Sequence, residues 1–184
     1  MQINIIHDSN RVDRKVLLDS EIRTHGLDVR LWPAIKDPQM TFRGINLAHK
    51  QIVRWAGLQK MPMVCIGEDD LHITGEGAWT YFVDHIPADF DLYLSCKYCG
   101  QILPDKTIKD FCGLHLYIVH ERFYETFLGV NELEHLDRGL ANKGKFVVAQ
   151  PCCAIQYDGW SDQKGRYAAY GHLLTGLEMC CDTI

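Results

Sequence analysis

A short, wholly apolar segment that runs into three consecutive acids is the feature that most limits what this chain can fold into. Residues 63–66 read Met-Val-Cys-Ile, and Gly67 separates them from Glu68-Asp69-Asp70. A strand without polar positions is buried on both faces, as is typical of the centre of a parallel sheet covered by helices. Open α/β sheets bind their ligands at the carboxyl ends of such strands. The sequence therefore predicts an α/β protein with a binding site at the acidic end of this strand.

Strands and helices alternate along the rest of the chain. Apolar runs predict further strands, and a 3.6-residue apolar period predicts helices. The expected strands are 2–6, 29–32, 91–95, 114–119 and 145–149, and the expected helices are 11–25, 45–58, 79–86, 121–128 and 133–141. This alternation predicts a single three-layer domain over residues 1–184 with a mixed, mainly parallel central sheet. The pattern weakens after Trp160, so residues 161–184 are expected to form a helical or loosely ordered C-terminal tail.

The first helix carries more detailed expectations. Asn10 precedes it and is the type of residue that caps a helix N-terminus, while Gly26 follows it and is typical of a C-terminal stop. The apolar side chains expected to form its buried face are Val12, Val16, Leu17 and Ile22.

Charge and hydropathy exclude several classes of protein. The chain has 184 residues with 19 basic and 24 acidic side chains, giving a net charge of −5. A basic surface for nucleic acid is therefore not evident. No apolar run approaches the roughly 20 residues that cross a bilayer, and the N-terminus lacks a cleavable signal pattern. We expect a cytoplasmic protein without a membrane span, whose eight cysteines are mostly free thiols.

The three acids are expected to face in two directions. Side chains alternate along an extended backbone, so Glu68 and Asp70 point to one side and Asp69 to the other. Two carboxylates on one side repel each other unless a cation joins them, and hard oxygen ligands suit Mg²⁺ or Mn²⁺. Glu68 and Asp70 are therefore predicted metal ligands for an ion that bridges a diphosphate. A solvated acidic turn is the alternative interpretation of the same residues.

A second set of residues has the spacing of a zinc site. Cys96 and Cys99 are separated by two residues, and so are Cys112 and His115. Three thiolates and an imidazole suit tetrahedral Zn²⁺, and four ligands would close a structural site. Chance matches are the competing explanation, because the chain is rich in cysteine and histidine.

An ordered series of motifs along the chain resembles glycosyltransferase family 25, which includes lipooligosaccharide and procollagen galactosyltransferases. The series spans residues 3–162 and consists of INIIHDSNRVDR (3–14), Trp32-Pro33-Ala34, GINLAH (44–49), Glu68-Asp69-Asp70, GLHLYI (113–118), Leu136-Asp137, Pro151, Gln156 and Ser161-Asp162. Ala48 stands where the family usually has serine. The chain is also shorter than most members and is rich in cysteine between residues 96 and 112.

The resemblance implies a GT-A fold and metal-dependent transfer of a hexose, galactose or glucose, from a UDP-sugar to the hydroxyl of a glycan or another acceptor. Mn²⁺ or Mg²⁺ on Glu68 and Asp70 would neutralise the diphosphate leaving group. Because members are described as inverting, the transfer needs a base, and Asp137 is the candidate.

The resemblance also implies donor-binding roles. The residues are Arg14, Arg11, His49 and Asp69, and His172 is a weaker candidate for a third metal ligand from the tail. For Arg11 a solvated helix face is an equal alternative, and for His49 the alternative is a satisfied core side chain. Two other functions stay open: a binding module stabilised by zinc, and an inactive family member that binds a nucleotide sugar.

Overall fold

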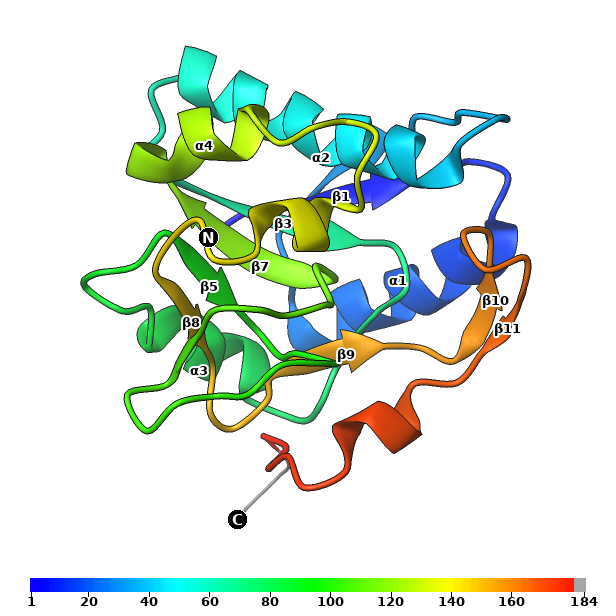
Figure 1. The fold of residues 1–184 in the computed structure, drawn as a ribbon. Helices are drawn as coiled ribbons and strands as arrows, with labels where there is room; N and C mark the ends of the chain where they lie inside the picture. Colours follow the sequence, from blue (N-terminus) through cyan, green and yellow to red (C-terminus); the bar gives the residue numbers. More distant parts are fainter. Residues whose placement is uncertain (181–184) are drawn as a thin grey trace.

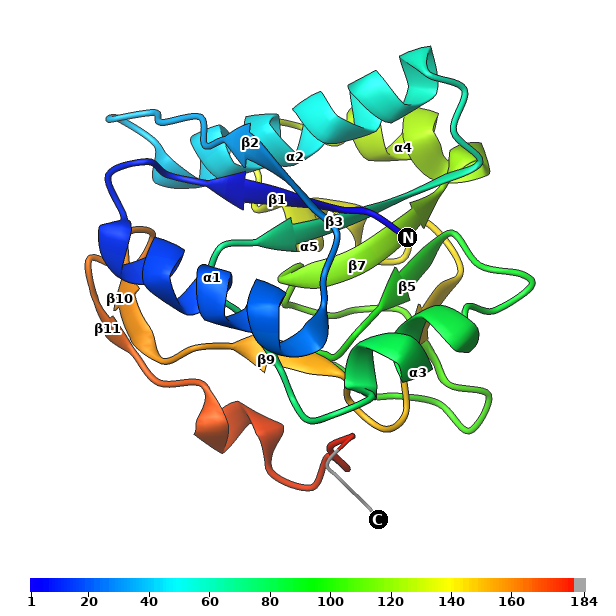
Figure 2. The same ribbon diagram turned by 180° about the vertical axis from the view of Figure 1, so that it is seen from behind.

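The computed structural model describes residues 1–180 and shows one central sheet between two layers of helices (Figures 1 and 2). Its strands are β1 (Ile3–His7), β2 (Val29–Pro33), β3 (Met63–Glu68), β5 (Leu92–Leu94), β6 (Thr107–Ile108), β7 (Leu116–His120) and β8 (Phe146–Val148). In the described part of the chain these seven strands lie in the order β2-β1-β3-β7-β5-β8-β6. Only β7 and β6 run antiparallel to their neighbours. The predicted mixed, mainly parallel sheet is therefore confirmed.

Helices cover both faces of the sheet. On one face lie α2 (Thr41–Leu58), α4 (Tyr124–Leu128), which follows the 3₁₀ helix η1 (Glu121–Phe123), and α5 (Leu136–Leu140). On the other face lie α1 (Val12–His25) and α3 (Ala78–Asp84). None of the helices in residues 1–180 combines the length and the apolar character needed to cross a membrane.

The central strand β3 shows why the sheet has two cores. Val64 and Ile66 belong to the apolar cluster that includes Ile52 of α2 and Phe127 of α4. Cys65 points the other way, into the cluster that includes Leu18 of α1. All three β3 side chains are buried, as a strand without polar positions requires. The strand ends at Glu68, so burial of its apolar part places the acids at the sheet edge.

Helix α1 differs from its expected form at its start and on its buried face. Asn10 does not cap it: Arg11 holds the N-cap position, and no side chain makes a capping hydrogen bond. Val12 and Val16 are 68% and 63% exposed, whereas α1 buries Leu18 and the charged Glu21. A tertiary contact explains why Glu21 is buried: its carboxylate accepts a hydrogen bond from the Ile73 amide at 2.9 Å. That contact turns the Glu21 side of the helix inward.

Two short antiparallel ribbons were not expected. β4 (Leu71–Ile73) pairs with β9 (Ala154–Gln156), and β10 (Gly159–Ser161) pairs with β11 (Arg166–Ala168). The β10–β11 hairpin and the 3₁₀ helix η2 (Gly171–Leu174) replace most of the helical or loose tail predicted after Trp160. Three-residue strands carry too little periodicity for a sequence pattern to identify them. The end of the predicted tail, residues 181–184, lies outside the described residues.

Candidate functional site

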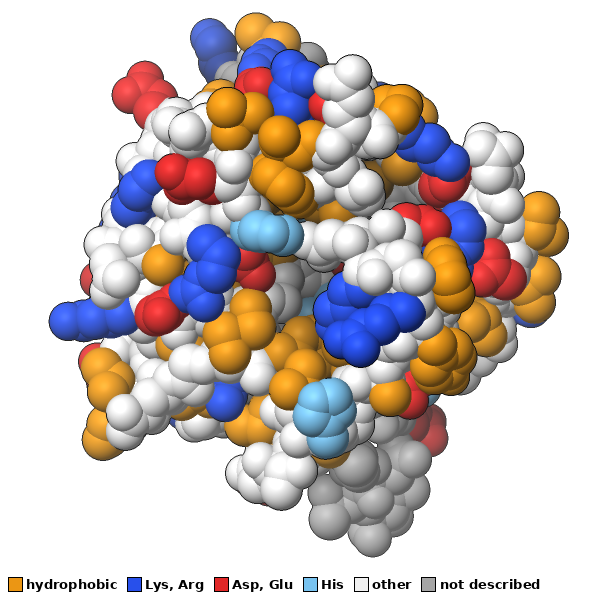
Figure 3. Space-filling model, turned by 45° about the vertical axis from the view of Figure 1, so that its right-hand side comes forward, with side chains coloured by type: hydrophobic (Ala, Val, Ile, Leu, Met, Phe, Trp, Pro, Cys, Tyr) orange, Lys and Arg blue, Asp and Glu red, His pale blue; other side chains and the backbone are white. Residues whose placement is uncertain are grey.

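A cavity of about 630 Å³ opens at the edge of the sheet where β1, β2 and β3 end. Figure 3 shows the hollow, with apolar side chains along its lower border and basic and histidine side chains around its rim. Its walls come from the ends of the three strands, the start of α2, residues 112–114, the start of α5, Gln156 and residues 161–164. This volume lies within the range of roughly 300–1,000 Å³ typical of small-molecule sites.

Glu68 and Asp70 converge on one amide group inside this cavity. The Gln156 Nε2 atom lies 3.1 Å from Glu68 Oε2, and 3.1 and 3.2 Å from the two carboxylate oxygens of Asp70. The pairing of β9 with β4 places Gln156 opposite Leu71, the residue after Asp70. The two acids therefore share one side of the chain, as the alternation of an extended backbone predicts.

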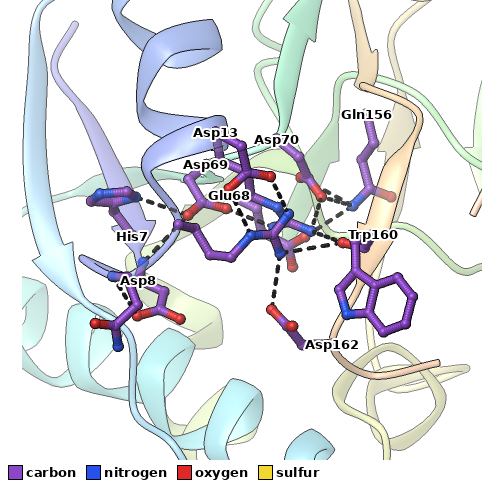
Figure 4. A network of polar contacts seen from close by, with 12 residues as sticks. His7, Asp8, Asp13, Glu68, Asp69, Asp70, Gln156, Trp160 and Asp162 are labelled. Atoms are coloured by element: carbon purple, nitrogen blue, oxygen red, sulfur yellow. Dashed lines mark hydrogen bonds and ion pairs between the residues drawn. The ribbon is translucent and has the colours of Figure 1, made fainter. Parts of the chain in front are cut away.

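Asp69 lines the same cavity and belongs to the same network, in which His7 and Arg14 hold its carboxylate (Figure 4). Arg14 donates to Asp69 Oδ1 at 2.7 Å, and the Nδ1 atom of His7 lies 2.9 Å from Asp69 Oδ2. A second nitrogen of Arg14 lies 3.1 Å from Asp70 Oδ2. Arg14, predicted to bind the donor, thus links helix α1 to two acids at the end of β3.

Burial and neighbouring charges shift the pKa values of Glu68 and Asp70. Burial raises the pKa of Asp70 to about 7, with the negative charge of Glu68 adding to the rise and Arg14 opposing it. Burial also disfavours ionisation of Glu68, but the hydrogen bond from His49 and the nearby charges of His49, His115 and Arg14 together outweigh it, and the pKa of Glu68 is lowered. Three acids therefore share a site in which Arg14 supplies the permanent positive charge.

His49 is both a buried side chain and part of the cavity wall. Only 1% of it is exposed, its Nδ1 atom lies 2.8 Å from the Tyr117 hydroxyl, and its Nε2 atom lies 3.2 Å from Glu68 Oε1. The two interpretations of His49 in the sequence are therefore compatible, because its ring connects the core to Glu68.

Arg11 lies at the rim and connects α1 to the β10–β11 hairpin. Its guanidinium pairs with Asp13 at 2.7 Å and with Asp162 at 3.0 Å, and it also donates to the Trp160 carbonyl at 3.2 Å. Arg11 lines the cavity rather than lying on a free helix face.

Asp137, at the start of α5, lines the same cavity. Its carboxylate accepts hydrogen bonds from the amides of Arg138 (2.8 Å) and Gly113. Burial raises the pKa of Asp137, and these hydrogen bonds oppose the rise. Gly113 has φ +108°, and a Cβ atom there would lie 2.9 Å from the Tyr98 ring, so the approach of this loop depends on glycine.

The structure does not bring the four predicted zinc ligands together. Cys96 forms a disulfide with Cys152, and His115 directs its Nε2 atom to the Ala154 carbonyl at 2.8 Å. Cys99 and Cys112 do face each other across an isolated β-bridge. Free thiols are found at Cys65, Cys99, Cys112 and Cys153. The spacing along the chain matched zinc, but Cys96 is directed toward residue 152 instead.

Two further observations concern metal ligands. His172 is exposed on η2 and does not line the cavity. Within residues 1–180, no group of three or more His, Cys, Asp or Glu side chains is placed to hold a metal ion. Any cation site at Glu68 and Asp70 therefore draws its remaining ligands from elsewhere.

Sequence reasoning gave no role to several residues of the site. Gln156 belongs to the motif series but carries no assigned contact, and His7 lies at the end of a predicted strand. Tyr98 is the third: its hydroxyl accepts a hydrogen bond from the Gln156 amide at 2.7 Å. The usable signals were the position of His7 directly after the predicted strand 2–6 and the place of Gln156 in the motif series.

Comparisons with known proteins match the structure rather than the sequence. No family model matches the chain, and no curated protein matches it. A glycosyltransferase involved in the glycosylation of the major capsid of PBCV-1 aligns with a TM-score of 0.52 and 10% identity, over 94% of this chain and 97% of that one. A Drosophila β-1,4-galactosyltransferase 7 mutant in complex with manganese, UDP-Gal and xylobiose aligns with a TM-score of 0.54 and 9% identity, over 97% of this chain and 80% of that one.

These likenesses concern the fold. Membership of glycosyltransferase family 25 stays a prediction, since no comparison identifies that family. The chain shares the GT-A-like fold of these two glycosyltransferases.

Proposed function

We propose that this chain is a glycosyltransferase that uses a divalent cation to transfer a hexose from a UDP-sugar to an acceptor hydroxyl. The observation that carries the proposal is the convergence of Glu68 and Asp70 inside a cavity of about 630 Å³ at the carboxyl end of β3. The GT-A-like fold supports it, because a structural neighbour contains manganese, UDP-Gal and xylobiose.

The donor set of this site fits Mn²⁺ or Mg²⁺. Both ligands are carboxylates, and the site holds more acidic than permanently basic charge, with Arg14 in contact with two of the three acids. Mg²⁺-type sites commonly use one or two carboxylates and complete their ligands with water and substrate phosphates. Bound by Glu68 and Asp70, such an ion would neutralise the charge that develops on the departing diphosphate.

The other residues of the cavity would position the two substrates. Arg14 and His7 fix Asp69, which keeps the loop after β3 in one conformation at the diphosphate end. His49 orients Glu68. Arg11 holds the β10–β11 hairpin beside the cavity mouth through Asp162.

Asp137 would act as the base. The acceptor oxygen attacks the anomeric carbon, its proton moves to the Asp137 carboxylate, and the bond from the anomeric carbon to the diphosphate breaks as UDP leaves with the electron pair. Burial raises the pKa of Asp137, which brings its basicity closer to working pH. The amides of Gly113 and Arg138 hold the carboxylate in place.

Donor binding tests this function. Nucleotide diphosphates and UDP-, GDP- and CDP-sugars are screened by thermal unfolding with Mn²⁺ or with chelator. A UDP-sugar at about 100 times its Kd should raise Tm by about 5–10 °C with Mn²⁺ and by much less with chelator. UDP release with and without acceptor then separates transfer from binding alone.

The matched variants are Asp70→Asn and Asp84→Asn. Asp84 is exposed at the end of α3, outside the cavity. Asp70→Asn should lose the nucleotide-dependent shift while Asp84→Asn keeps it. Absence of a shift with every nucleotide and nucleotide sugar in wild type would contradict the proposed function.

A further inference from the structure

The Gln156 side chain occupies the place between Glu68 and Asp70 where a cation would have to lie. Its Nε2 atom makes contacts of 3.1 to 3.2 Å with one oxygen of Glu68 and both oxygens of Asp70. Ionised carboxylates only accept hydrogen bonds, so the group between them must be a donor or a cation. The Gln156 amide therefore points its nitrogen at the acids.

The backbone of Gln156 is held from three directions. Its amide donates to the Tyr98 hydroxyl at 2.7 Å, β9 pairs with β4 at Leu71, and the next residue, Tyr157, donates to the Asp70 carbonyl at 2.8 Å. These contacts hold the backbone of Gln156 in place, so the residue cannot move away from Glu68 and Asp70 by a shift of β9. Rotation about the last side-chain bond remains available, and it exchanges the amide nitrogen for an oxygen of nearly the same size.

We propose, on the basis of the proposed function, that Gln156 is a third protein ligand of the divalent cation. Its amide rotates on binding so that Oε1 replaces Nε2 at Glu68 and Asp70. Without the ion, Nε2 separates two like charges. With the ion, Oε1 joins two carboxylates to give an all-oxygen protein donor set, which suits Mg²⁺ or Mn²⁺.

The charges of the site explain why this ligand is an amide. Arg14 is bonded to Asp69 at 2.7 Å and lies 3.1 Å from Asp70, so its positive charge offsets part of the charge of both acids. When ionised, the three acids together exceed Arg14 by two negative charges, which would balance the two charges of the ion. A third carboxylate at position 156 would add repulsion in the free protein, while a glutamine adds a ligand oxygen without adding charge.

A simpler role for Gln156 makes the opposite prediction. If the amide only spaces the two acids, the ion must displace it and gains nothing from it. Removing the amide would then leave Mn²⁺ affinity unchanged or increase it. If Gln156 is a ligand, removing the amide weakens Mn²⁺ binding.

The test is Mn²⁺ binding to the whole chain without nucleotide, measured by calorimetry and by loss of the free Mn²⁺ electron-paramagnetic-resonance signal. Gln156→Leu should weaken binding about tenfold, and Gln156→Glu should tighten it about tenfold at neutral pH because it adds an anionic ligand. Gln163→Leu is the matched control, because Gln163 lines the same cavity but contacts His135 instead of the acids. Its affinity should stay within about twofold of wild type.

Nuclear magnetic resonance gives a second readout. The side-chain amide resonance of Gln156 is identified by its absence in Gln156→Leu. Addition of diamagnetic Mg²⁺ should shift this resonance, because the amide hydrogens no longer donate hydrogen bonds to Glu68 and Asp70. Wild-type or tighter affinity in Gln156→Leu would overturn the inference. If Gln156→Leu does not fold, unchanged or weaker affinity in Gln156→Glu would do so.

The outcomes for Gln156 and for the overall function are separable. If Mn²⁺ affinity falls in Gln156→Leu and rises in Gln156→Glu, but no nucleotide binds, the proposed function is wrong while Gln156 remains a metal ligand. Mn²⁺-dependent UDP binding that is unchanged in Gln156→Leu would remove only the ligand role. A wild-type protein that binds no Mn²⁺ would overturn both the inference and the metal dependence of the function.

Discussion

The two walls of the cavity are built differently. On the wall formed by β1, β3, α1 and β9, every acid is bonded to a neighbour: Asp69 to His7 and Arg14, and Glu68 and Asp70 to Gln156. On the wall formed by α5 and the β10–β11 hairpin, exposed side chains make the contacts, such as Gln163 to His135 at 2.7 Å. We call these the acidic wall and the hairpin wall.

This difference indicates that the two walls have different roles. The acidic wall is preorganised by buried charges, which suits a ligand group of fixed chemistry such as a metal diphosphate. The hairpin wall is held by exposed polar contacts, each of which contributes little to the free energy of unfolding. This wall can therefore change its conformation with a small change in free energy. Within the proposed function, the acidic wall would take the donor and the hairpin wall the acceptor.

The largest expected effect is on the rate, at Asp137 of the hairpin wall. Asp137→Asn keeps the size of the side chain and removes its basicity, so turnover should fall by about 10²–10⁴-fold. Affinity for the UDP-sugar should stay near that of wild type, because Asp137 does not contact Glu68 or Asp70 in the hydrogen-bond network. Steady-state release of UDP and calorimetry measure the two quantities. A turnover within about threefold of wild type would remove Asp137 as the base.

Two matched arginine variants test the walls for stability. Arg14→Ala leaves Asp69 and Asp70, both 4% exposed, without their guanidinium partner, and should cost about 3 kcal/mol of unfolding free energy. Arg138→Ala removes an exposed ion pair with Asp110 and should cost about 0–1 kcal/mol. Urea unfolding monitored by tryptophan fluorescence compares them. Equal losses in the two variants would show that the acidic wall is no more rigid than the hairpin wall.

The acidic wall should also give the protein a pH-dependent stability. Burial raises the pKa of Asp70 from 3.8 to about 7, so between these values the folded protein binds more protons than the unfolded chain. The unfolding free energy contributed by Asp70 should therefore decrease as pH rises from about 4 to about 7. Chemical unfolding in chelator at several pH values measures this slope. Asp70→Asn should flatten it, and a slope that persists in the variant would assign it to other groups.

The smallest effect is expected at the tip of the hairpin. Gln163→Ala removes the contact with His135 between exposed side chains, and it should change the unfolding free energy by no more than about 0.5 kcal/mol. Hydrogen exchange at residues 161–168 should nevertheless become faster, because the contact joins the hairpin to α5. A loss above 1 kcal/mol would show that the hairpin wall is part of the cooperative core.

The fold and part of the site could be predicted from local sequence signals. Residues 63–66 identified the central strand because full burial needs apolar side chains at every position, and the alternation along that strand placed Glu68 and Asp70 on one side. The start of α1 could not be predicted in the same way. Its first two apolar residues, Val12 and Val16, lie in solvent, because Glu21 binds residues 51 and 136 positions away.

The sequence by itself determined the order of the longer strands and helices and the position of the acids, since both follow from neighbouring residues and from burial. The tertiary structure alone decided which side chains meet those acids. Gln156 lies 88 residues from Glu68, and a three-residue strand pairing brings the two together. The same holds for Cys96, which has the spacing of a zinc ligand and is joined to Cys152 instead. Such contacts depend on how strands pair across the whole chain, and no local pattern records that choice.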